Sequence, residues 1–295
     1  MPGGVEIRRD GDVCVEVDMG LRINTNTQSL ASQRTLGLNN AAQTKSIEKL
    51  SSGSRIVRAA DDAAGLAISE RMRGQLRSQA QGIRNANDGI SMIQTAEGAM
   101  NEVSNMLIRF RELSMQGASD TISNTERKFI DTEVQQLNTE IERISQSTEY
   151  NGTKLLNGEA GVLEIQVGLN NNPEQDRFVF DAGNTKVTTD HLGVSGLSVS
   201  SKEDSQGNLE KIDNALNTVN ANRASLGAMQ NRLTASVSNM QIYSENLANA
   251  QSRIRDIDVA SETSELTKAN ILTSAGISVL SQANQNPMAA LKLIG

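Results

Sequence analysis

Large aromatic side chains are nearly absent from this chain. Its 295 residues include no Trp, two Tyr and four Phe, so aromatics make up 2% of the sequence. Aromatic residues supply much of the burial energy in thick cores, and their scarcity argues against a multilayer globule. No apolar run approaches the roughly 20 residues that a membrane-spanning helix needs, so we expect no insertion into a membrane.

Cysteine and histidine each occur once. Cys14 has no partner for an intramolecular disulfide, and His191 leaves any His-based catalytic site with a single base. No Cys/His cluster has the spacing of zinc ligands. We interpret His191 as a solvated loop residue and expect no enzyme activity, metal or cofactor.

Positive charge is neither in excess nor clustered. The chain has 28 Lys and Arg against 35 Asp and Glu, which gives a formal net charge of −7 at pH 7. Nucleic acids and anionic membranes attract basic patches, so neither is an expected partner. No cleavable secretory signal follows Met1 or Met19, since neither precedes a basic and then an apolar stretch. If the protein leaves the cell, another route carries it.

Two long apolar series stand out against this polar background. One repeats every seven residues: Ile212, Val219, Leu226, Leu233, Met240, Leu247 and Ile254. The other steps by three and four: Ile93, Ala96, Met100, Val103, Leu107 and Phe110. An α-helix turns once per ~3.6 residues, so each series forms a narrow stripe along one side of a long helix. We predict that the two helices pack side by side and bring the chain ends together.

Residues 1–18 differ from everything that follows. Their apolar residues alternate in a strand-like way around a Gly-Asp turn: Val5, Ile7, Val13, Val15 and Val17. We interpret this segment as an upstream extension and Met19 as the native start. A small N-terminal β element is the alternative.

Local signals divide the N-terminal half into three helices. Ser51-Ser52-Gly53-Ser54 interrupts the first, and Asp61-Asp62 can cap the second, which continues to about Gly117. No other ligands converge on the two carboxylates, so capping is favoured over catalysis or metal binding. A third helix begins near Asn124, with the apolar positions Ile130, Val134, Leu137, Ile141 and Ile144. These stripes predict a helical hairpin or bundle.

A β-hairpin is predicted after this bundle. Asn151-Gly152 is a strong turn signal, and residues 163–167 and 177–180 alternate with the period of strands. Residues 182–208 are rich in Gly, Ser and Thr, which predicts a short surface excursion.

The last helix is amphipathic, and we expect Pro287 to end it or to lie close to its end. One predicted face carries Leu266, Ala269, Leu272, Gly276, Val279 and Ala283. Both terminal segments have only thin apolar seams, which are marginal in isolation. We therefore expect them to be poorly ordered in a monomer and to fold when many copies stack.

Eight motifs in order resemble those of bacterial flagellin, the subunit of the flagellar filament. They cover nearly all of the chain after Met19 and comprise residues 21–26, 48–56, 61–65, 84–91, 111–113, 150–156, 252–258 and 278–284. The resemblance implies a mainly α, elongated helical bundle or coiled coil built from both halves, with a small β-hairpin region.

The resemblance also implies a domain division. Residues 19–60 and 256–295 would pair as an inner filament domain, and residues 61–181 and 209–255 would form an outer coiled-coil domain. Flagellins often insert large outer domains where this chain has only residues 182–208, so it is similar to a short type. Residues 1–18 lie outside the family pattern.

The implied function is polymerisation into a filament for swimming motility. The chain would be exported unfolded by the flagellar type III apparatus to the extracellular flagellum. Implied partners are other copies of the chain, a flagellin export chaperone, and the filament cap and hook-junction proteins. Polymerisation and chaperone binding fall to the last helix, through Leu266, Leu272, Val279, Leu280 and Ala283.

Vertebrate Toll-like receptor five is a further implied partner. The matching contact candidates are Arg109, Arg111, Glu112, Leu113, Gln116 and Glu133. Two alternatives to the filament subunit are a hook-filament junction protein and a soluble coiled-coil adaptor. An inserted metallopeptidase needs a His-Glu-x-x-His motif, which a single histidine excludes.

Overall fold

The computed structural model describes residues 25–294, with side chains up to residue 285, and the chain divides into two compact units. Unit 1 comprises the described chain up to Ala67 and from Ser252 on, and unit 2 is Ile68–Gln251. The strand-like extension predicted over residues 1–18 lies outside the described residues. None of the described helices has an apolar stretch long enough to cross a bilayer.

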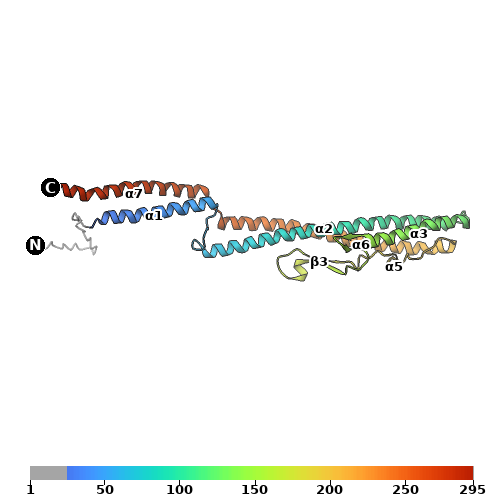
Figure 1. Cartoon of the computed structure of the whole chain (residues 1–295). Helices are drawn as coiled ribbons and strands as arrows, with labels where there is room; N and C mark the ends of the chain where they lie inside the picture. Colours follow the sequence, from blue (N-terminus) through green and yellow to red (C-terminus); the bar gives the residue numbers. More distant parts are fainter. Residues whose placement is uncertain (1–24, 295) are drawn as a thin grey trace, which may run out of the picture. The chain divides into compact units, whose positions relative to one another are not determined.

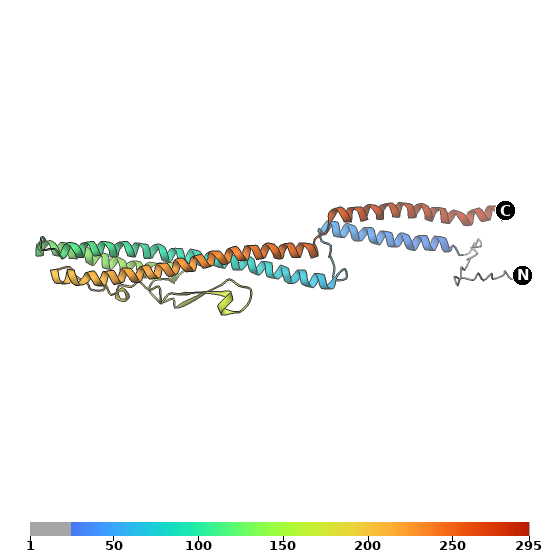
Figure 2. The same ribbon diagram turned by 180° about the vertical axis from the view of Figure 1, so that it is seen from behind.

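Unit 1 is built on two helices that lie side by side, α1 (Thr27–Ser52) and α7 (Val259–Ile294) (Figures 1 and 2). They run in opposite directions. α1 ends at Gly53, whose φ of 67° is a left-handed conformation that glycine adopts without strain. The predicted break after Ser52 is confirmed. α7 continues past Pro287 to Ile294, so the proline does not end the helix but lies near its end.

Residues 53–62 join α1 to α2 (Ala63–Gly117) and contact the end of α6 (Lys202–Arg255). The Arg55 N–H donates to the Arg255 carbonyl at 2.7 Å. Asp62 Oδ1 accepts the Gly65 N–H at 2.8 Å and so caps α2, as the sequence predicts.

Asp61 is the main polar anchor of this joining segment. Its Oδ2 accepts the backbone N–H groups of Val57 and Arg58 at 3.3 and 3.1 Å. Its Oδ1 lies 2.7 Å from Lys45 Nζ. The hydrogen bond from Lys45, followed by those from the backbone, lowers the pKa of Asp61 to about 2.

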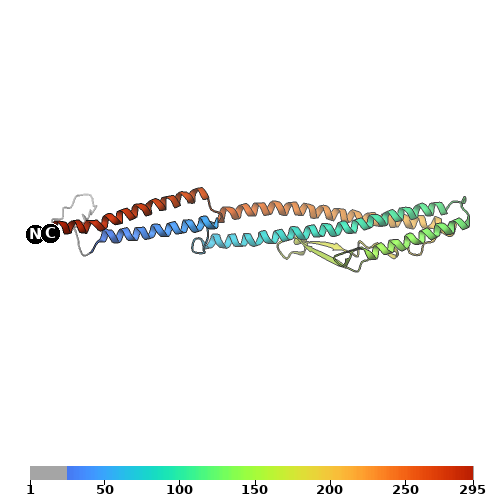
Figure 3. The ribbon, with the colours of Figure 1, turned by 45° about the horizontal axis from the view of Figure 1, so that its top comes forward.

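Unit 2 contains α2, α3 (Asn124–Ser147) and α6, with the β strands along one part of the bundle (Figure 3). α3 begins with a reciprocal capping box between Ser123 and Glu126. The mainly α fold with a small β region, as predicted, is confirmed.

The two predicted apolar series supply the centre of unit 2. These side chains are buried in one core cluster: Ile93, Met100, Leu107, Ile212, Val219, Leu226, Leu233 and Met240. Leu247 is also buried, whereas Ile254, which lies in unit 1, is half-buried. An ion pair of 2.6 Å between Arg111 Nε and Asp213 Oδ1 joins α2 to α6.

Two short hairpins follow α3. β1 (Glu149–Tyr150) pairs with β2 (Thr153–Lys154) around Asn151 and Gly152, whose positive φ angles of 49° and 79° suit a tight hairpin turn. β3 (Val162–Gln166) pairs antiparallel with β4 (Arg177–Asp181), and the short helix α4 (Pro173–Asp176) lies between them. The predicted hairpin is confirmed.

The end of β3 lies in a notch on α2 that two glycines leave open. A Cβ atom on Gly82 would lie 2.3 Å from the Val167 carbonyl oxygen, and one on Gly89 would lie 2.6 Å from Ile165 Cδ1. Between them, Asn85 Nδ2 donates to the Gln166 carbonyl at 2.9 Å. These contacts explain why this face of α2 carries Gly82, Asn85 and Gly89 at spacings of three and four residues.

Residues 182–199 depart from the predicted surface excursion, because their apolar side chains are buried in the core of unit 2. Val187, Val194 and Val199 are fully buried, and α5 (Thr189–Leu192) forms one turn. α6 then begins at Lys202, earlier than the predicted start of the last coiled-coil segment at residue 209. The apolar residues here are too widely and irregularly spaced to have a recognisable period.

A polar stripe on α3 holds this segment in place. The Asp131 carboxylate accepts the Val199 N–H at 2.7 Å, and Glu142 accepts the Thr189 N–H at 2.9 Å. Between them, Gln135 and Asn138 donate to backbone carbonyls of the segment, each at 2.9 Å. The stripe satisfies backbone groups that burial would otherwise leave without partners.

Candidate self-assembly surface

The face between α1 and α7 is unusually polar. On α1 the inward positions step by three and four and are mostly polar: Ser29, Ser32, Leu36, Asn39, Gln43, Ser46 and Leu50. Three side-chain pairs link the helices: Ser29 with Asn284 at 2.8 Å, Gln43 with Asn270 at 2.6 Å, and Lys49 with Glu262 at 3.2 Å. A hydrogen bond from Ser46 is the largest cause of the lowered pKa of Glu262.

Small residues let the helices approach each other. A Cβ atom on Gly276 would lie 3.4 Å from Leu36 Cδ1, so the leucine packs directly over the glycine. Ala269 and Ala283 of α7 are buried on the same side. The interface between α1 and α7 therefore buries few large apolar groups.

The large apolar side chains of both helices lie on the outside instead. Leu38 is 66% exposed on α1, and Ile271 is 62% exposed on α7. Others that are exposed on this pair are Leu30, Ile47, Val259, Leu272, Ile277 and Val279. We call these eight residues the outer apolar set.

This arrangement corrects the face predicted for the last helix. Leu272 and Val279 belong to the outer apolar set, whereas the sequence places them on one face with Ala269 and Ala283. Leu266 and Leu280 are half-buried on the α1 side. On α7 the small residues Ala269 and Ala283 face inward, and the larger Leu272 and Val279 are exposed.

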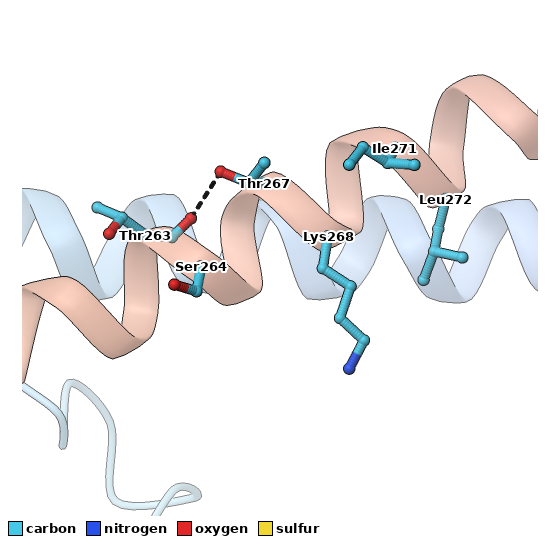
Figure 4. A pocket seen from close by; sticks show the side chains of 6 residues that line it. All are labelled: Thr263, Ser264, Thr267, Lys268, Ile271 and Leu272. Atoms are coloured by element: carbon cyan, nitrogen blue, oxygen red, sulfur yellow. Dashed lines mark hydrogen bonds between the residues drawn. The ribbon is translucent and has the colours of Figure 1, made fainter.

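A shallow groove of about 470 Å³ lies along the outer side of α7 (Figure 4). The hydroxyls of Thr263, Ser264 and Thr267 donate to carbonyls within their own helix, the last to the Thr263 carbonyl at 2.8 Å. They are therefore satisfied internally and leave methyl and methylene groups toward solvent. With Ile271 and Leu272, these residues make a surface more apolar than its sequence suggests.

The receptor-contact candidates lie in unit 2, on and beside one exposed face of α2. Arg109 Nε donates to Glu133 of α3 at 2.9 Å and Arg109 Nη1 to Glu112 at 3.2 Å, which raises the pKa of Arg109, chiefly through Glu133. Gln116 is exposed on the same helix.

The remaining two candidates do not share this exposure. Leu113 is 2% exposed and belongs to the core, so it supports the face from below rather than forming part of it. The half-buried Arg111 points to Asp213 of α6. The structure thus brings together Arg109, Glu112 and Glu133 and separates Arg111 and Leu113 from them.

Phe129 of α3 has no place in the sequence prediction, yet it is 72% exposed. It lies one helical turn before Glu133 and outside the buried series that begins at Ile130. The sequence does contain a signal for this position, because Phe129 is an aromatic residue outside the apolar spacing of its helix.

Comparisons with known proteins agree with this architecture. Residues 23–160 match the N-terminal helical region of bacterial flagellin, and residues 209–294 match its C-terminal helical region. A flagellin from Halalkalibacterium halodurans is 43% identical over 272 residues, which cover 92% of this chain and 99% of the relative. Flagellin from Bacillus subtilis is 41% identical over 308 residues, covering 93% of this chain and all of the relative.

A solved structure also matches. Bacillus cereus flagellin aligns with 53% of this chain and 88% of its own, at 29% identity and a TM-score of 0.48. The named relatives do not favour the hook-filament junction protein or the soluble adaptor. The chain belongs to the bacterial flagellin family and is a structural subunit of the flagellar filament.

Proposed function

We propose that copies of this chain assemble through the outer apolar set of α1 and α7. The observation that carries the proposal is the reversed polarity of this helix pair, with polar and small residues inside and Leu38 and Ile271 outside. Exposed apolar area of this extent is costly in water and is stabilised when another copy covers it. Assembly thereby supplies the burial that the helix pair lacks alone.

The same surface gives a reason for an export chaperone. Before assembly, Leu272, Val279 and their neighbours would remain exposed in the cell and invite premature polymerisation. A chaperone that covers the outer side of α7 prevents this, and a thinly packed helix pair unfolds readily for passage through a type III apparatus to the extracellular flagellum. Cap and hook-junction proteins would cover the equivalent surfaces at the filament ends.

We also propose Arg109, Glu112, Gln116 and Glu133 as contacts for Toll-like receptor five. Their exposure on neighbouring turns of α2 and α3 supports a shared charged face. Arg109→Ala should reduce receptor activation by the monomer. Arg143→Ala removes another exposed Arg, which pairs with Glu140 on α3, so it serves as the matched control. Equal activation by the two variants would remove Arg109 from the contact.

Seeded polymerisation of purified chain tests the assembly proposal. Ile271→Gln with Ile277→Gln should abolish growth, because both replace outer apolar side chains with polar ones. Thermal unfolding of unit 2 should not change. Ser281→Gln puts a polar side chain of the same size at another exposed position of α7 and should leave growth intact. Normal growth of the double variant would overturn the proposal.

A further inference from the structure

α7 contains a carbonyl that its own helix cannot satisfy. Pro287 has no backbone N–H, so the Ala283 carbonyl four residues earlier loses its usual helical donor. The oxygen instead accepts a hydrogen bond from Asn26 Nδ2 on the other helix, at 2.8 Å. The partner that the proline removes is thus supplied from α1.

Asn26 uses both ends of its amide. Its Oδ1 accepts the Ser29 N–H at 3.0 Å and caps α1, while its Nδ2 makes the bond to α7. Ser and Asp also make good N-caps, but neither has an amide N–H₂ to extend across to the other helix. An asparagine meets both requirements at this position.

We infer that Asn26 and Pro287 form a lock that sets the register of α1 against α7. In a regular helix each carbonyl already accepts the N–H four residues later, so a further donor at its second lone pair adds less than a donor to a carbonyl that has no other partner. Because Pro287 has no N–H to donate, the Ala283 carbonyl lacks its helical partner and accepts the bond from Asn26. A shift of α7 by one heptad would move this carbonyl away from Asn26 and leave it without a donor in a partly buried place.

The rest of the helix interface agrees with this single register. Leu36 packs over Gly276, and Lys49 pairs with Glu262 at the far end. A shift of seven residues in either direction would also separate Gln43 from Asn270, whose side chains form a hydrogen bond of 2.6 Å. Polar groups inside a helix pair specify its register in this way, because misalignment leaves them facing apolar side chains.

The lock is tested by a double-mutant cycle in the full chain. Asn26→Ser keeps an N-cap but removes the amide donor, so amide exchange along α1 in filaments should accelerate about tenfold, the effect of one lost hydrogen bond of ordinary strength. Pro287→Ala restores an N–H to the Ala283 carbonyl. In that background Asn26→Ser should have little effect. Asn40→Ser makes the same substitution at an exposed position of α1 and serves as the control.

Two results would overturn the inference. One is the same acceleration in both backgrounds, which would mean that Asn26 acts independently of the proline. The other is no acceleration in the native background. If Asn26→Ser does not assemble, seeded growth is the readout: recovery on adding Pro287→Ala supports the lock, and continued failure contradicts it.

Discussion

Leu233 shows at the scale of one residue what holds unit 2 together. Its side chain is fully buried in the core cluster and belongs to the seven-residue series of α6. Leu233→Ala should lower the free energy of unfolding by about 2 to 5 kcal/mol, through lost burial and the cavity left behind. Thermal or urea unfolding measures this loss. Lys211→Ala, at an exposed position of the same helix, should change little; equal effects would mean that the series does not form the core.

Asp61 makes the segment between α1 and α2 sensitive to acid. Its pKa is about 2, against 3.8 for an ordinary Asp, because the carboxylate accepts hydrogen bonds from Lys45 and two backbone N–H groups. A folded-state pKa below the unfolded one gives stability that is complete above about pH 4 and is lost as pH falls toward 2.

Amide exchange at Val57 and Arg58 should therefore accelerate, relative to the intrinsic rate, as pH falls through this window. In Asp61→Asn the acceleration should be missing, since that side chain does not titrate. An identical pH profile in the two proteins would show that another group controls the segment.

At the scale of elements, the packing of β3 on α2 depends on Gly82. Gly82→Ala would press a methyl group against the Val167 backbone, which cannot rotate away, and should cost about 1 to 3 kcal/mol of stability. Gly98 lies on the same helix with nothing within 4 Å of its added Cβ. Gly98→Ala should instead add up to about 1 kcal/mol through helix propensity. If both variants changed the melting temperature in the same direction, the close packing of β3 against Gly82 would be contradicted.

Elements with a strong local signal could be predicted from the sequence. The Asn151-Gly152 turn and the alternating strands each specify their structure within a few residues, and both are confirmed. The seven-residue series extends along most of α6 and is buried from Ile212 to Leu247. Residues 182–199 were missed because their burial depends on α3, whose Asp131 and Glu142 bind backbone groups distant in sequence.

The face of α7 could not be predicted for a different physical reason. Apolar periodicity identifies a stripe that avoids water, but it does not say whether the partner is within the chain or in another copy. Leu272 and Val279 are exposed within one chain. In the proposed assembly, their partner is another copy. The N-terminal cap at Asn26 and the proline at Pro287 are each visible in the sequence, yet their pairing depends on the fold.

At the scale of the whole molecule, the two units differ in the polarity of their interiors. Unit 2 buries large apolar side chains such as Phe110 and Leu226 within one chain. Between α1 and α7, unit 1 buries mostly small and polar side chains, and it exposes Leu38 and Ile271. Under the assembly proposed above, we expect the first to behave as a folded module and the second as a polymerisation element.

Hydrogen-deuterium exchange of monomer and filament tests this division most directly. Core amides of α2 and α6 around Leu107 and Leu226 should be protected in both states, because their burial is complete within one chain. Amides of α1 and α7 should exchange rapidly in the monomer and gain most of their protection on assembly. Equal protection of α1 and α7 in monomer and filament would contradict the account, since their stability would then not depend on other copies.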